Sequence, residues 1–576
     1  NRGEWMKHAY WDAYDMTEWF AAQPWSNGKI GMWGCSATGE TQLQAVASNP
    51  PHLKAVFPMS CQGDYWGTGG GVVSNADEGK PAPAIPYWVP YNARAVPVDA
   101  DTDGSWLNAA RSGQSNGSEI GYAPYRDSAS AWVLEKLGLT VRWNLETSPH
   151  TYFKEIARSR IPMYNSGNWQ DAGTLRWGPL LRLKNLRNPA KVLLSPGGHC
   201  IWYTDYSPKP YPLTFKIVNE ELRWFDYWLK GVPNGIMDEP PIYLFTYNTD
   251  VGREWKFAWQ WPLPDEKRIN LYLGPSPATG KPSGVNNGTL SETPPSLADA
   301  KDEYTADYSV TAADRNQKGL TYTTDPLPSD IEVTGDPVVE LWASSTAADG
   351  DFFAYLEDVD PEGTTAFFAV DGSQRASSRE LHRPPYDTWG LPWHRNFAED
   401  AKPLEPGKPV KLAFNMGTAS YIFKAGHRIR LILTCASAAT PKLSPPPVVN
   451  IYRNPFLKSR LVLPVGGSPV KADVSIEPKR FNPESKGLFT AFVAFPKSLA
   501  KGYVEDLKIA SVTLNGVPAL SGKLHHNIWI FKFNQEAFPG MLKTHKAKMF
   551  IEGSFGQKFN YGNLTFEGTD VIRTSR

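Results

Sequence analysis

The 576-residue chain has no excess of charge of either sign, because 59 Lys and Arg residues balance 59 Asp and Glu residues. A neutral chain offers no electrostatic basis for binding nucleic acid or a charged membrane surface. The chain also lacks an apolar run approaching the ~20 residues that span a bilayer. We therefore expect neither a nucleic-acid partner nor a membrane span.

Cysteine is scarce, with four residues and no C-x-x-C spacing. This spacing argues against a zinc or redox motif, and we expect no metal site and no cofactor. The acidic residues between 349 and 360 lack the spacing of an EF-hand loop, so we interpret them as part of a solvated loop. We expect Cys35, Cys61, Cys200 and Cys435 to be buried free thiols.

What the chain does contain is a strand–turn–helix pattern near its start. The apolar run Lys29–Gly34 predicts a buried strand, and Ser36 follows it, flanked by Gly34 and Gly39, before a run with helical spacing. A sharp turn that presents a Ser above a sheet edge is a nucleophile elbow, in which the Ala37 amide would face an oxyanion. Because the spacing is G-x-S-x-x-G rather than G-x-S-x-G, the motif alone leaves an ordinary strand–turn–helix open.

The order of elements changes along the chain. Helices and strands alternate before residue 63 and after residue 159, as in a parallel α/β sheet, whereas Gly and Pro break up the stretch between. Short strands with turn residues follow Asn234–Gly235. With a length that favours about three to five domains, we predict an α/β plus all-β chain. Its parts are an α/β-hydrolase domain (1–63 and 159–235), an inserted helical cap (64–158), a jelly-roll β-sandwich (236–466) and an additional β-sandwich (467–576).

Individual elements are predicted from apolar runs and their periodicity. The expected helices are 10–22, 42–47, 129–137, 175–186 and 215–229, and the expected strands of the hydrolase part are 29–34, 52–58, 161–166 and 190–195. The expected strands of the β part are 242–246, 268–273, 337–343, 424–434, 488–495, 507–514, 528–533 and 548–553.

Three residues form a candidate catalytic triad. Ser36, Asp171 and His199 each follow a predicted strand, and their order along the chain is that of α/β-hydrolases. Ser36 would be the nucleophile, His199 the general base, and Asp171 the acid that orients the imidazole. Taken singly, Asp171 is better explained as a turn or helix-cap residue and His199 as a loop residue after two glycines. The three residues together, in this order and context, favour the triad. Trp169 would line the acyl pocket or pack in the core, with equal support for each.

Several stretches resemble one family of acyl hydrolases. The matching segments are Gln23–Ser36, Pro50–Ala55, Gly167–Asp171, Pro196–His199, Phe225–Gly231, Asn234–Gly235, Tyr322–Leu327, Val333–Gly335, Ala425–Leu431 and Ser459–Pro464. The chain resembles the CocE/NonD-type hydrolases, which group cocaine esterase, α-amino acid ester hydrolases, glutaryl acylases and X-prolyl dipeptidyl peptidases. The resemblance implies an α/β-hydrolase domain with a helical cap and a C-terminal jelly roll, with the active site between them.

The chain departs from the family pattern at three points. Ala37 stands where the family usually has Tyr after the nucleophile, which changes a pocket wall. The family's oxyanion-hole Tyr lies on an early strand that this sequence does not contain. No acidic group follows Asp171 to hold a substrate ammonium, since Ala172 and Gly173 come next, which weighs against the specificity of α-amino acid ester hydrolases.

These observations favour a serine hydrolase that cleaves carboxylic esters through an acyl-enzyme on Ser36. An X-prolyl dipeptidyl-peptidase or acylase acting on amides is the alternative, and a β-rich binding protein with a vestigial hydrolase domain is a second. Cys200, although next to His199, has no second His placed to activate it as a nucleophile.

The elbow comes early, whereas several strands should precede it in a hydrolase sheet. We therefore expect an N-terminal segment or a partner chain to complete the sheet, and a homo-oligomer stays open. The first residues show no signal-peptide pattern. The compartment is not fixed by the sequence, with a secreted or periplasmic location slightly favoured.

Overall fold

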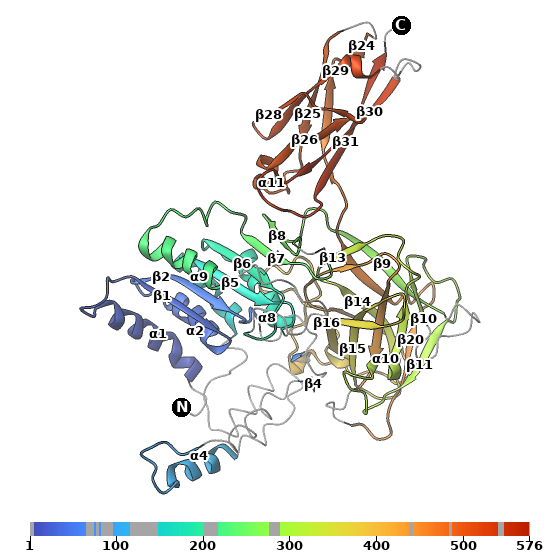
Figure 1. The fold of residues 1–576 in the computed structure, drawn as a ribbon. Coiled ribbons are helices and arrows are strands. Elements are labelled where there is room, and N and C mark those ends of the chain that lie inside the picture. Colours follow the sequence, from blue (N-terminus) through green and yellow to red (C-terminus); the bar gives the residue numbers. More distant parts are fainter. Residues whose placement is uncertain are drawn as a thin grey trace.

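The computed structural model describes residues 5–64, 74–75, 80–81, 96–115, 148–171, 173–200, 217–250, 252–275, 288–436, 442–482, 486–538 and 546–574. These residues form an α/β domain, a middle β-domain beside it and a C-terminal β-domain that projects from the other two (Figure 1). The predicted hydrolase domain followed by β-structure is confirmed. The expected helix 129–137 lies outside the described residues.

The hydrolase sheet has the order β1-β2-β5-β6-β7-β8, in which the first five strands are parallel and β8 is antiparallel to β7. Its strands are β1 (Ile30–Cys35), β2 (Leu53–Met59), β5 (Met163–Asn168), β6 (Ala190–Ser195), β7 (Ile242–Phe245) and β8 (Trp255–Ala258). Apart from half-buried β1, the parallel strands are largely buried. This fits the continuous apolar runs from which most of them were predicted.

Helices cover both faces of this sheet. They are α1 (Trp5–Ala21), α2 (Ala37–Ser48), η3 (Pro149–Tyr152), α7 (Phe153–Ser159), α8 (Gly173–Asn185), α9 (Ile217–Phe225) and the π-helical turn η4 (Asp226–Lys230). On one face, Leu43 and Val46 of α2 pack with Val56 and Met163. On the other face, Trp224 of α9 is fully buried, and its indole donates to the Val56 carbonyl over 3.1 Å. The predicted helices 10–22, 42–47, 175–186 and 215–229 correspond to α1, α2, α8, and α9 with η4.

The strand predicted at 242–246 exists, but its sheet was assigned wrongly. We expected it in the β part that begins at residue 236, whereas β7 pairs with β6 as the fifth strand of the hydrolase sheet. Tyr243 on β7 stacks on Trp255 and Phe257 of β8, at centroid distances of 4.9 and 4.3 Å. A four-residue apolar run reads the same in either sheet, so only the tertiary pairing distinguishes the two assignments.

Few elements of the predicted cap are described. They are the short strands β3 (Ser74–Asn75) and β4 (Lys80–Pro81), which pair with each other, and the helix α4 (Ser105–Ser115). The insertion begins and ends at the sheet, where Tyr386 of the middle β-domain donates to Asp64 over 2.5 Å and Ser148 lies 3.4 Å from the same carboxylate.

The middle β-domain is a network of strands whose core is continuous with that of the hydrolase domain. Its strands are β9 (Lys267–Gly274), β10 (Gly288–Ser291), β11 (Lys301–Thr305), β12 (Leu320–Thr323), β13 (Ile331–Gly335), β14 (Val338–Ser345), β15 (Asp351–Val359), β16 (Thr365–Arg375), β17 (Val410–Asn415), β18 (Ala419–Phe423), β19 (Arg428–Thr434), β20 (Val448–Tyr452) and β21 (Arg460–Val465). Short helical turns α10 (Arg315–Lys318), η5 (Ala376–Ser378) and η6 (Ala398–Asp400) connect some of them.

The acidic cluster predicted as a solvated loop is wrong in its burial. Asp351, Glu357 and Asp358 lie on the buried strand β15. Arg375 lies 3.3 Å from Asp351, and Asp358 receives hydrogen bonds from its neighbours, including the Tyr421 hydroxyl at 2.7 Å. Burial of these acidic residues is tolerated because cations and hydroxyl donors lie against them. These partners come from other segments of the chain, so the sequence around residues 349–360 does not reveal them.

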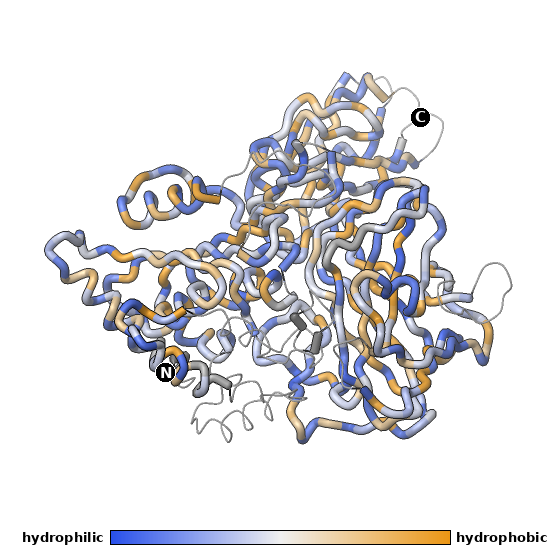
Figure 2. The backbone as a smooth tube through the Cα atoms, turned by 60° about the horizontal axis from the view of Figure 1, so that its bottom comes forward, coloured by the Kyte–Doolittle hydropathy of each residue, from blue (hydrophilic) through white to orange (hydrophobic). Residues whose placement is uncertain are grey.

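The C-terminal β-domain consists of two sheets around a separate core. One sheet contains β22 (Val470–Lys471), β24 (Arg480–Phe481), β26 (Leu507–Leu514), β27 (Val517–Pro518), β30 (Lys546–Phe555) and β31 (Thr565–Thr574), and the other β23 (Asp473–Glu477), β25 (Leu488–Ala494), β28 (Ser521–His525) and β29 (Ile528–Asn534). The turns α11 (Lys501–Glu505) and η7 (Gln535–Ala537) complete it. Buried and less buried residues alternate along strands such as β25 and β30, as expected where one face of each sheet is buried. Hydrophobic and hydrophilic segments are interspersed along the tube near the C-terminus in Figure 2.

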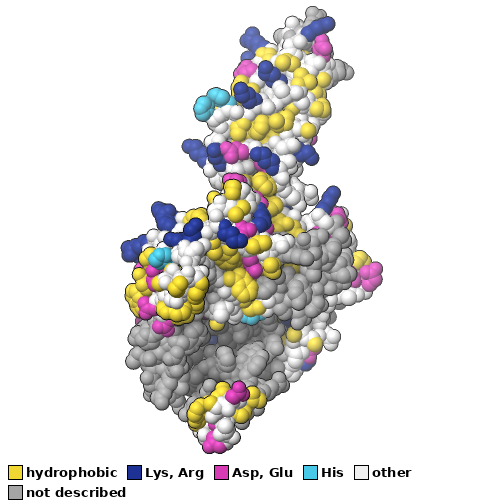
Figure 3. Space-filling model, turned by 60° about the vertical axis from the view of Figure 1, so that its left-hand side comes forward, with side chains coloured by type: hydrophobic (Ala, Val, Ile, Leu, Met, Phe, Trp, Pro, Cys, Tyr) yellow, Lys and Arg dark blue, Asp and Glu magenta, His cyan; other side chains and the backbone are white. Residues whose placement is uncertain are grey.

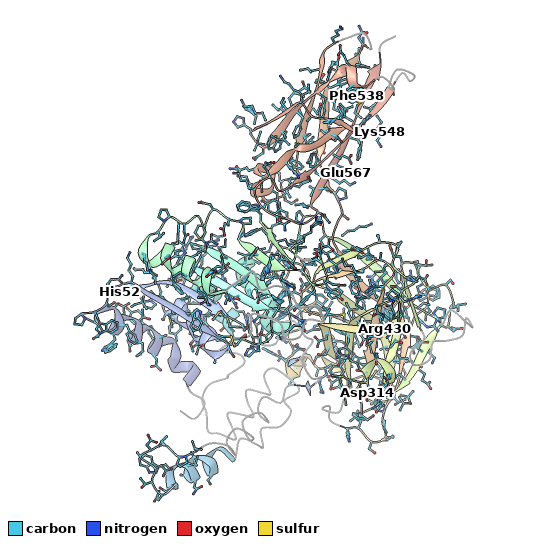
Figure 4. All side chains as sticks on the ribbon, in the orientation of Figure 1. His52, Asp314, Arg430, Phe538, Lys548 and Glu567 are labelled. Carbon is cyan, nitrogen blue, oxygen red and sulfur yellow. A yellow bond between two sulfur atoms is a disulfide. The ribbon has the colours of Figure 1, made fainter. Side chains whose placement is uncertain are left out.

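Among the described residues, no helix has both the length and the apolar character needed to span a membrane. The labelled residues Phe538, Lys548 and Glu567 mark the projecting C-terminal β-domain in Figure 4, well away from the hydrolase sheet.

Candidate active site

Ser36 occupies the turn between β1 and α2, as predicted for a nucleophile elbow. Its backbone has φ 59° and ψ −126°, a conformation that a non-glycine residue adopts only under constraint. The Ser36 amide donates to the Met59 carbonyl over 2.9 Å, and the Ser36 carbonyl accepts from Gly39 over 2.8 Å. These bonds fix the strained turn at the carboxyl ends of β1 and β2.

The two glycines around Ser36 lie where a Cβ would collide with main chain at Gly39 and with the Thr38 side chain at Gly34. A Cβ on Gly39 would lie 2.7 Å from the Met59 carbonyl oxygen, which is main chain of the adjacent strand. A Cβ on Gly34 would lie 2.5 Å from the Thr38 hydroxyl oxygen. The extra residue between Ser36 and the second glycine therefore does not prevent the elbow, because Gly39 is the position that meets β2.

Asp171 and His199 meet at the same edge of the sheet. Asp171 follows β5 and His199 follows β6, and His199 Nδ1 lies 3.1 and 3.0 Å from the two Asp171 carboxylate oxygens. The Asp171 side chain is 2% exposed and that of His199 45% exposed. A buried carboxylate at Nδ1 favours the tautomer with its proton there, in which Nε2 is the ring nitrogen with a lone pair that can accept a proton.

Asn168 is a site residue that the sequence analysis missed. Its amide nitrogen donates to the Gly198 carbonyl over 2.8 Å and to the Ser60 hydroxyl over 3.1 Å, while its oxygen accepts from the Ser195 hydroxyl. It thereby joins the loops after β2, β5 and β6. The available signal was a polar residue just after the predicted strand and three positions before Asp171.

The loops that carry Asp171 and His199 are also joined through the main chain and supported from the middle β-domain. The Gln170 amide donates to the Gly197 carbonyl over 2.9 Å. The Tyr247 hydroxyl donates to the Pro196 carbonyl, and the Tyr247 amide donates to Ser420 over 3.0 Å. Buried Arg176 donates to the Trp169 carbonyl over 3.2 Å and lies 3.4 Å from Asp371.

The two residues predicted to line the site differ in exposure. Ala37 is exposed. Because it is the first residue of α2, its amide is one of the helix N-terminal groups that have no intrahelical acceptor. Trp169 is 1% exposed and donates to the Phe245 carbonyl over 2.6 Å. The structure thus places Trp169 in the core shared with the middle β-domain, the second of the two interpretations of this residue.

Cys35 and Cys200 correct our prediction of free thiols, because they form a disulfide with a Cα–Cα distance of 5.9 Å. They are 165 residues apart, so nothing in the sequence marks them as neighbours, whereas the sheet brings the end of β1 and the loop after β6 to one edge. Cys61 and Cys435 are buried free thiols as predicted. Burial raises the pKa of the Cys61 thiol to about 11, which leaves it protonated and unreactive.

Other polar groups do not join this constellation. Among the residues described, no group of three or more His, Cys, Asp or Glu side chains is arranged to hold a metal ion. His52, which belongs to one of the matching segments, lies beside α1 at the amino end of β2 (Figure 4), with its Nδ1 2.6 Å from Glu18. Since Ser36 lies at the carboxyl end of the sheet, His52 is at the opposite end.

Comparison with protein families gives two matches along the chain. Residues 3–201 match the model described as X-Pro dipeptidyl-peptidase (S15 family). Residues 234–458 match the model described as the X-Pro dipeptidyl-peptidase C-terminal non-catalytic domain. The first match ends just after His199 and Cys200, and the second spans β7 to the segment before β21.

Individual relatives include named esterases. The chain is 28% identical to a candidate serine esterase of Mycobacterium bovis, over 80% of each chain. It is 26% identical to the cocaine esterase of a Rhodococcus species, over 81% of this chain and 86% of that one. A solved CocE/NonD family hydrolase from Staphylococcus aureus has the same fold at 20% identity, with a TM-score of 0.57 over 80% of this chain and 77% of the other. These matches show that the chain is a serine hydrolase and that it belongs to the CocE/NonD-type family.

Proposed function

We propose that this protein hydrolyses carboxylic esters through an acyl-enzyme on Ser36. The Ser36 hydroxyl attacks the acyl carbon while His199 Nε2 removes its proton, and the protonated imidazole then delivers that proton to the leaving alcohol. Water repeats the sequence on the acyl-enzyme and releases the acid. Asp171 holds the imidazole tautomer and stabilises its charged form.

The observation that carries this proposal is the 3.0 Å contact between His199 Nδ1 and buried Asp171, on the same sheet edge as strained Ser36. The Ala37 amide, at the N-terminus of α2, supports an oxyanion hole beside the nucleophile. Removal of one oxyanion-hole donor from a hydrolase costs on the order of 10²–10³ in turnover.

The experiment is labelling with a fluorophosphonate, which reacts with an activated serine. We expect a stoichiometric adduct on the tryptic peptide that contains Ser36, and none in the Ser36→Ala variant with an unchanged circular dichroism spectrum. A folded chain that takes up no label, or takes it up elsewhere, would overturn the triad and favour a β-rich binding protein with a vestigial hydrolase domain.

An amide or X-prolyl peptide substrate is the second candidate. The descriptions of both family models support it, whereas the named esterases among the relatives favour an ester. We expect p-nitrophenyl acetate to be turned over with a kcat/KM at least 10-fold above that of an X-Pro-p-nitroanilide. The reverse order would assign the chain to peptide hydrolysis with the same triad.

We also propose the finer architecture that the resemblance implies. Residues 64–158 form a helical cap over the site, residues 236–466 a jelly roll apart from the strands β7 and β8, and residues 467–576 a separate β-sandwich. The two-sheet arrangement around one core supports the last of these.

A further polypeptide strand is proposed to pair with β1, supplied by an N-terminal segment or a partner chain. Within the described residues β1 pairs only with β2, and Trp33 on β1 is 58% exposed. Trp25, just before β1, is 69% exposed. Figure 3 brings this side of the molecule forward and shows hydrophobic side chains at its surface. An unpaired edge beside large apolar side chains is a site for strand addition.

Hydrogen–deuterium exchange tests this edge. We expect the amides of Ile30–Cys35 to exchange faster in the isolated chain than those of the central strand β5, and to become protected when the adding polypeptide or a second copy binds. Analytical ultracentrifugation separates these two occupants. A fully active monomer whose β1 edge stays open to exchange would contradict the proposal.

A further inference from the structure

The Cys35–Cys200 disulfide lies directly against the proposed catalytic residues. Cys35 precedes Ser36 and Cys200 follows His199, so the bridge joins the backbone of the nucleophile loop to that of the base loop, one residue from each. Both cysteines are half-buried, and Cys200 has φ 58°. The bridge spans 165 residues of sequence.

The sheet by itself joins these two loops only stepwise. In the order β1-β2-β5-β6, two strands separate the strand that leads to Ser36 from the strand that leads to His199. Hydrogen bonds run from Ser36 to Met59, from Ser60 to Ser166, and from Asn168 to Gly198. A shift at any step would move the base relative to the nucleophile, whereas the disulfide links the two loops directly.

The His199 side chain is only partly enclosed by the protein. Its Nδ1 contact with Asp171 fixes one ring nitrogen, but the side chain is 45% exposed, so packing encloses only part of the ring. Where Nε2 lies relative to Ser36 therefore depends on the position of the His199 backbone as well as on the Asp171 contact. Displacements of about 1 Å in such a geometry can cost on the order of 10² in rate.

We propose that the Cys35–Cys200 disulfide is a positioning element of the active site, which holds the His199 loop against the Ser36 elbow and makes turnover depend on the oxidised state of this pair. The inference rests on the proposed triad. It assigns a role to two residues that carry no chemistry in the reaction itself. Reduction by a dithiol transfers two electrons and two protons to the bridge and yields the Cys35 and Cys200 thiols and the cyclic disulfide of the reductant.

The test compares the Cys35→Ala/Cys200→Ala double variant with wild type, using a small p-nitrophenyl ester. We expect kcat to fall by about 10- to 100-fold while KM changes less than threefold, because the bridge orders the reacting groups rather than the substrate pocket. The rate of fluorophosphonate labelling should fall by the same factor, since it needs the same activated serine. Cys435→Ala, which removes a buried free thiol from the middle β-domain, is the matched control and should keep wild-type turnover.

Dithiothreitol provides a second arm that needs no substitution. Folded wild-type protein should lose activity as thiol titration registers two new thiols, and should regain it on reoxidation, while the double variant should not respond. This arm decides the question if the double variant does not fold.

Two outcomes would overturn the inference. One is unchanged kcat and labelling rate in folded protein without the bridge. The other is a loss of activity that only parallels the loss of folded protein by circular dichroism, which would make the bridge a stabiliser of the fold. Neither outcome affects the triad, because Ser36→Ala and the labelled peptide test it separately.

Discussion

At the scale of single residues, the site depends on backbone positions that tolerate no alternative. Ser36 keeps φ at 59° because bonds to Met59 and Gly39 hold the turn on both sides. Strain of this kind costs on the order of 1–3 kcal/mol and persists only where the surroundings impose it. Its position at the tip of a strand–turn–helix is what lifts the hydroxyl clear of the sheet.

Gly39→Ala should impair the elbow. The new Cβ would lie 2.7 Å from the Met59 carbonyl, so either α2 or β2 must move. We expect a loss of stability of about 1–3 kcal/mol, in the range of overpacking, together with reduced turnover, measured by urea unfolding and ester hydrolysis. Gly350→Ala is the control, because its Cβ would meet no atom within 4 Å; equal effects from both would show that Gly39 has no special constraint.

Asp171→Asn should leave the fold intact and lower kcat by roughly 10⁴, the size expected when the imidazole takes the wrong tautomer. The amide nitrogen of Asn can donate to Nδ1, which would move the ring proton to Nε2. A protonated Nε2 cannot accept the proton of the Ser36 hydroxyl. The measurement is steady-state turnover with the fold checked by circular dichroism. A fall of less than tenfold would remove Asp171 from the triad.

At the scale of elements, the hydrolase sheet is longer than its α/β pattern indicates. β7 adds in parallel and β8 closes the far edge in antiparallel fashion. The loop at Asn560 of the C-terminal β-domain then covers β8, since the Phe257 amide donates to its carbonyl over 2.7 Å. One edge of the sheet is thus protected from strand addition by a domain some 300 residues later in sequence.

The connection from β8 to β9 carries a carboxyl group that responds to pH. Desolvation raises the pKa of Glu266 from 4.5 to about 7, against the opposing effect of Arg268 at 3.1 Å. Between these values the folded state retains a proton that the unfolded state has released. The free energy of unfolding should therefore fall as pH rises from about 4.5 to 7, by on the order of 2–3 kcal/mol.

Glu266→Gln removes this titration. In urea unfolding, we expect the free energy of unfolding of the variant to lack that decrease with pH. The variant should therefore be more stable than wild type at pH 8. Glu303→Gln, at an exposed position on β11, should keep the wild-type pH profile. An unchanged profile in Glu266→Gln would mean that the carboxyl is ionised in the folded protein at neutral pH.

At the scale of the whole molecule, the C-terminal β-domain is separate in its core but attached by aromatic contacts. Trp259, just after β8, donates through its indole to the Tyr561 hydroxyl over 2.8 Å, and its amide lies 3.0 Å from the Tyr503 hydroxyl. Gln260 accepts from the Ala500 amide over 2.7 Å. The domain otherwise projects away from the sheet that carries Ser36 (Figure 1).

Deletion of the chain after Gly467 should spare hydrolysis of a small ester, because the proposed triad lies wholly in the hydrolase domain. The truncated protein should nevertheless melt at a lower temperature, since Phe257 and Trp259 lose their cover. Kinetics and thermal unfolding measure the two effects independently. Loss of activity in a truncated protein that stays folded would make this domain part of the site.

Local sequence patterns account for the short-range features of this protein. Periodicity located α1, α2, β1, β2, β5 and β6. The chain order of Ser36, Asp171 and His199 pointed to them as the candidate triad in the loops after these strands. The elbow could be predicted from sequence because its requirements are local. They are an apolar strand, a small residue on each side of the turn, and a helix that begins directly after the Ser. Resemblance to known hydrolases then supplied the family.

Which distant segments meet is known from the three-dimensional structure alone. It paired Cys35 with Cys200, placed β7 in the hydrolase sheet, buried the acidic residues of β15 beside Arg375 and Tyr421, and moved Trp169 into the core. Each of these depends on contacts between residues far apart in the chain. Local periodicity shows that a segment is a strand and that a residue is apolar or charged, but the neighbour that pairs with it is set by the packing of the whole chain.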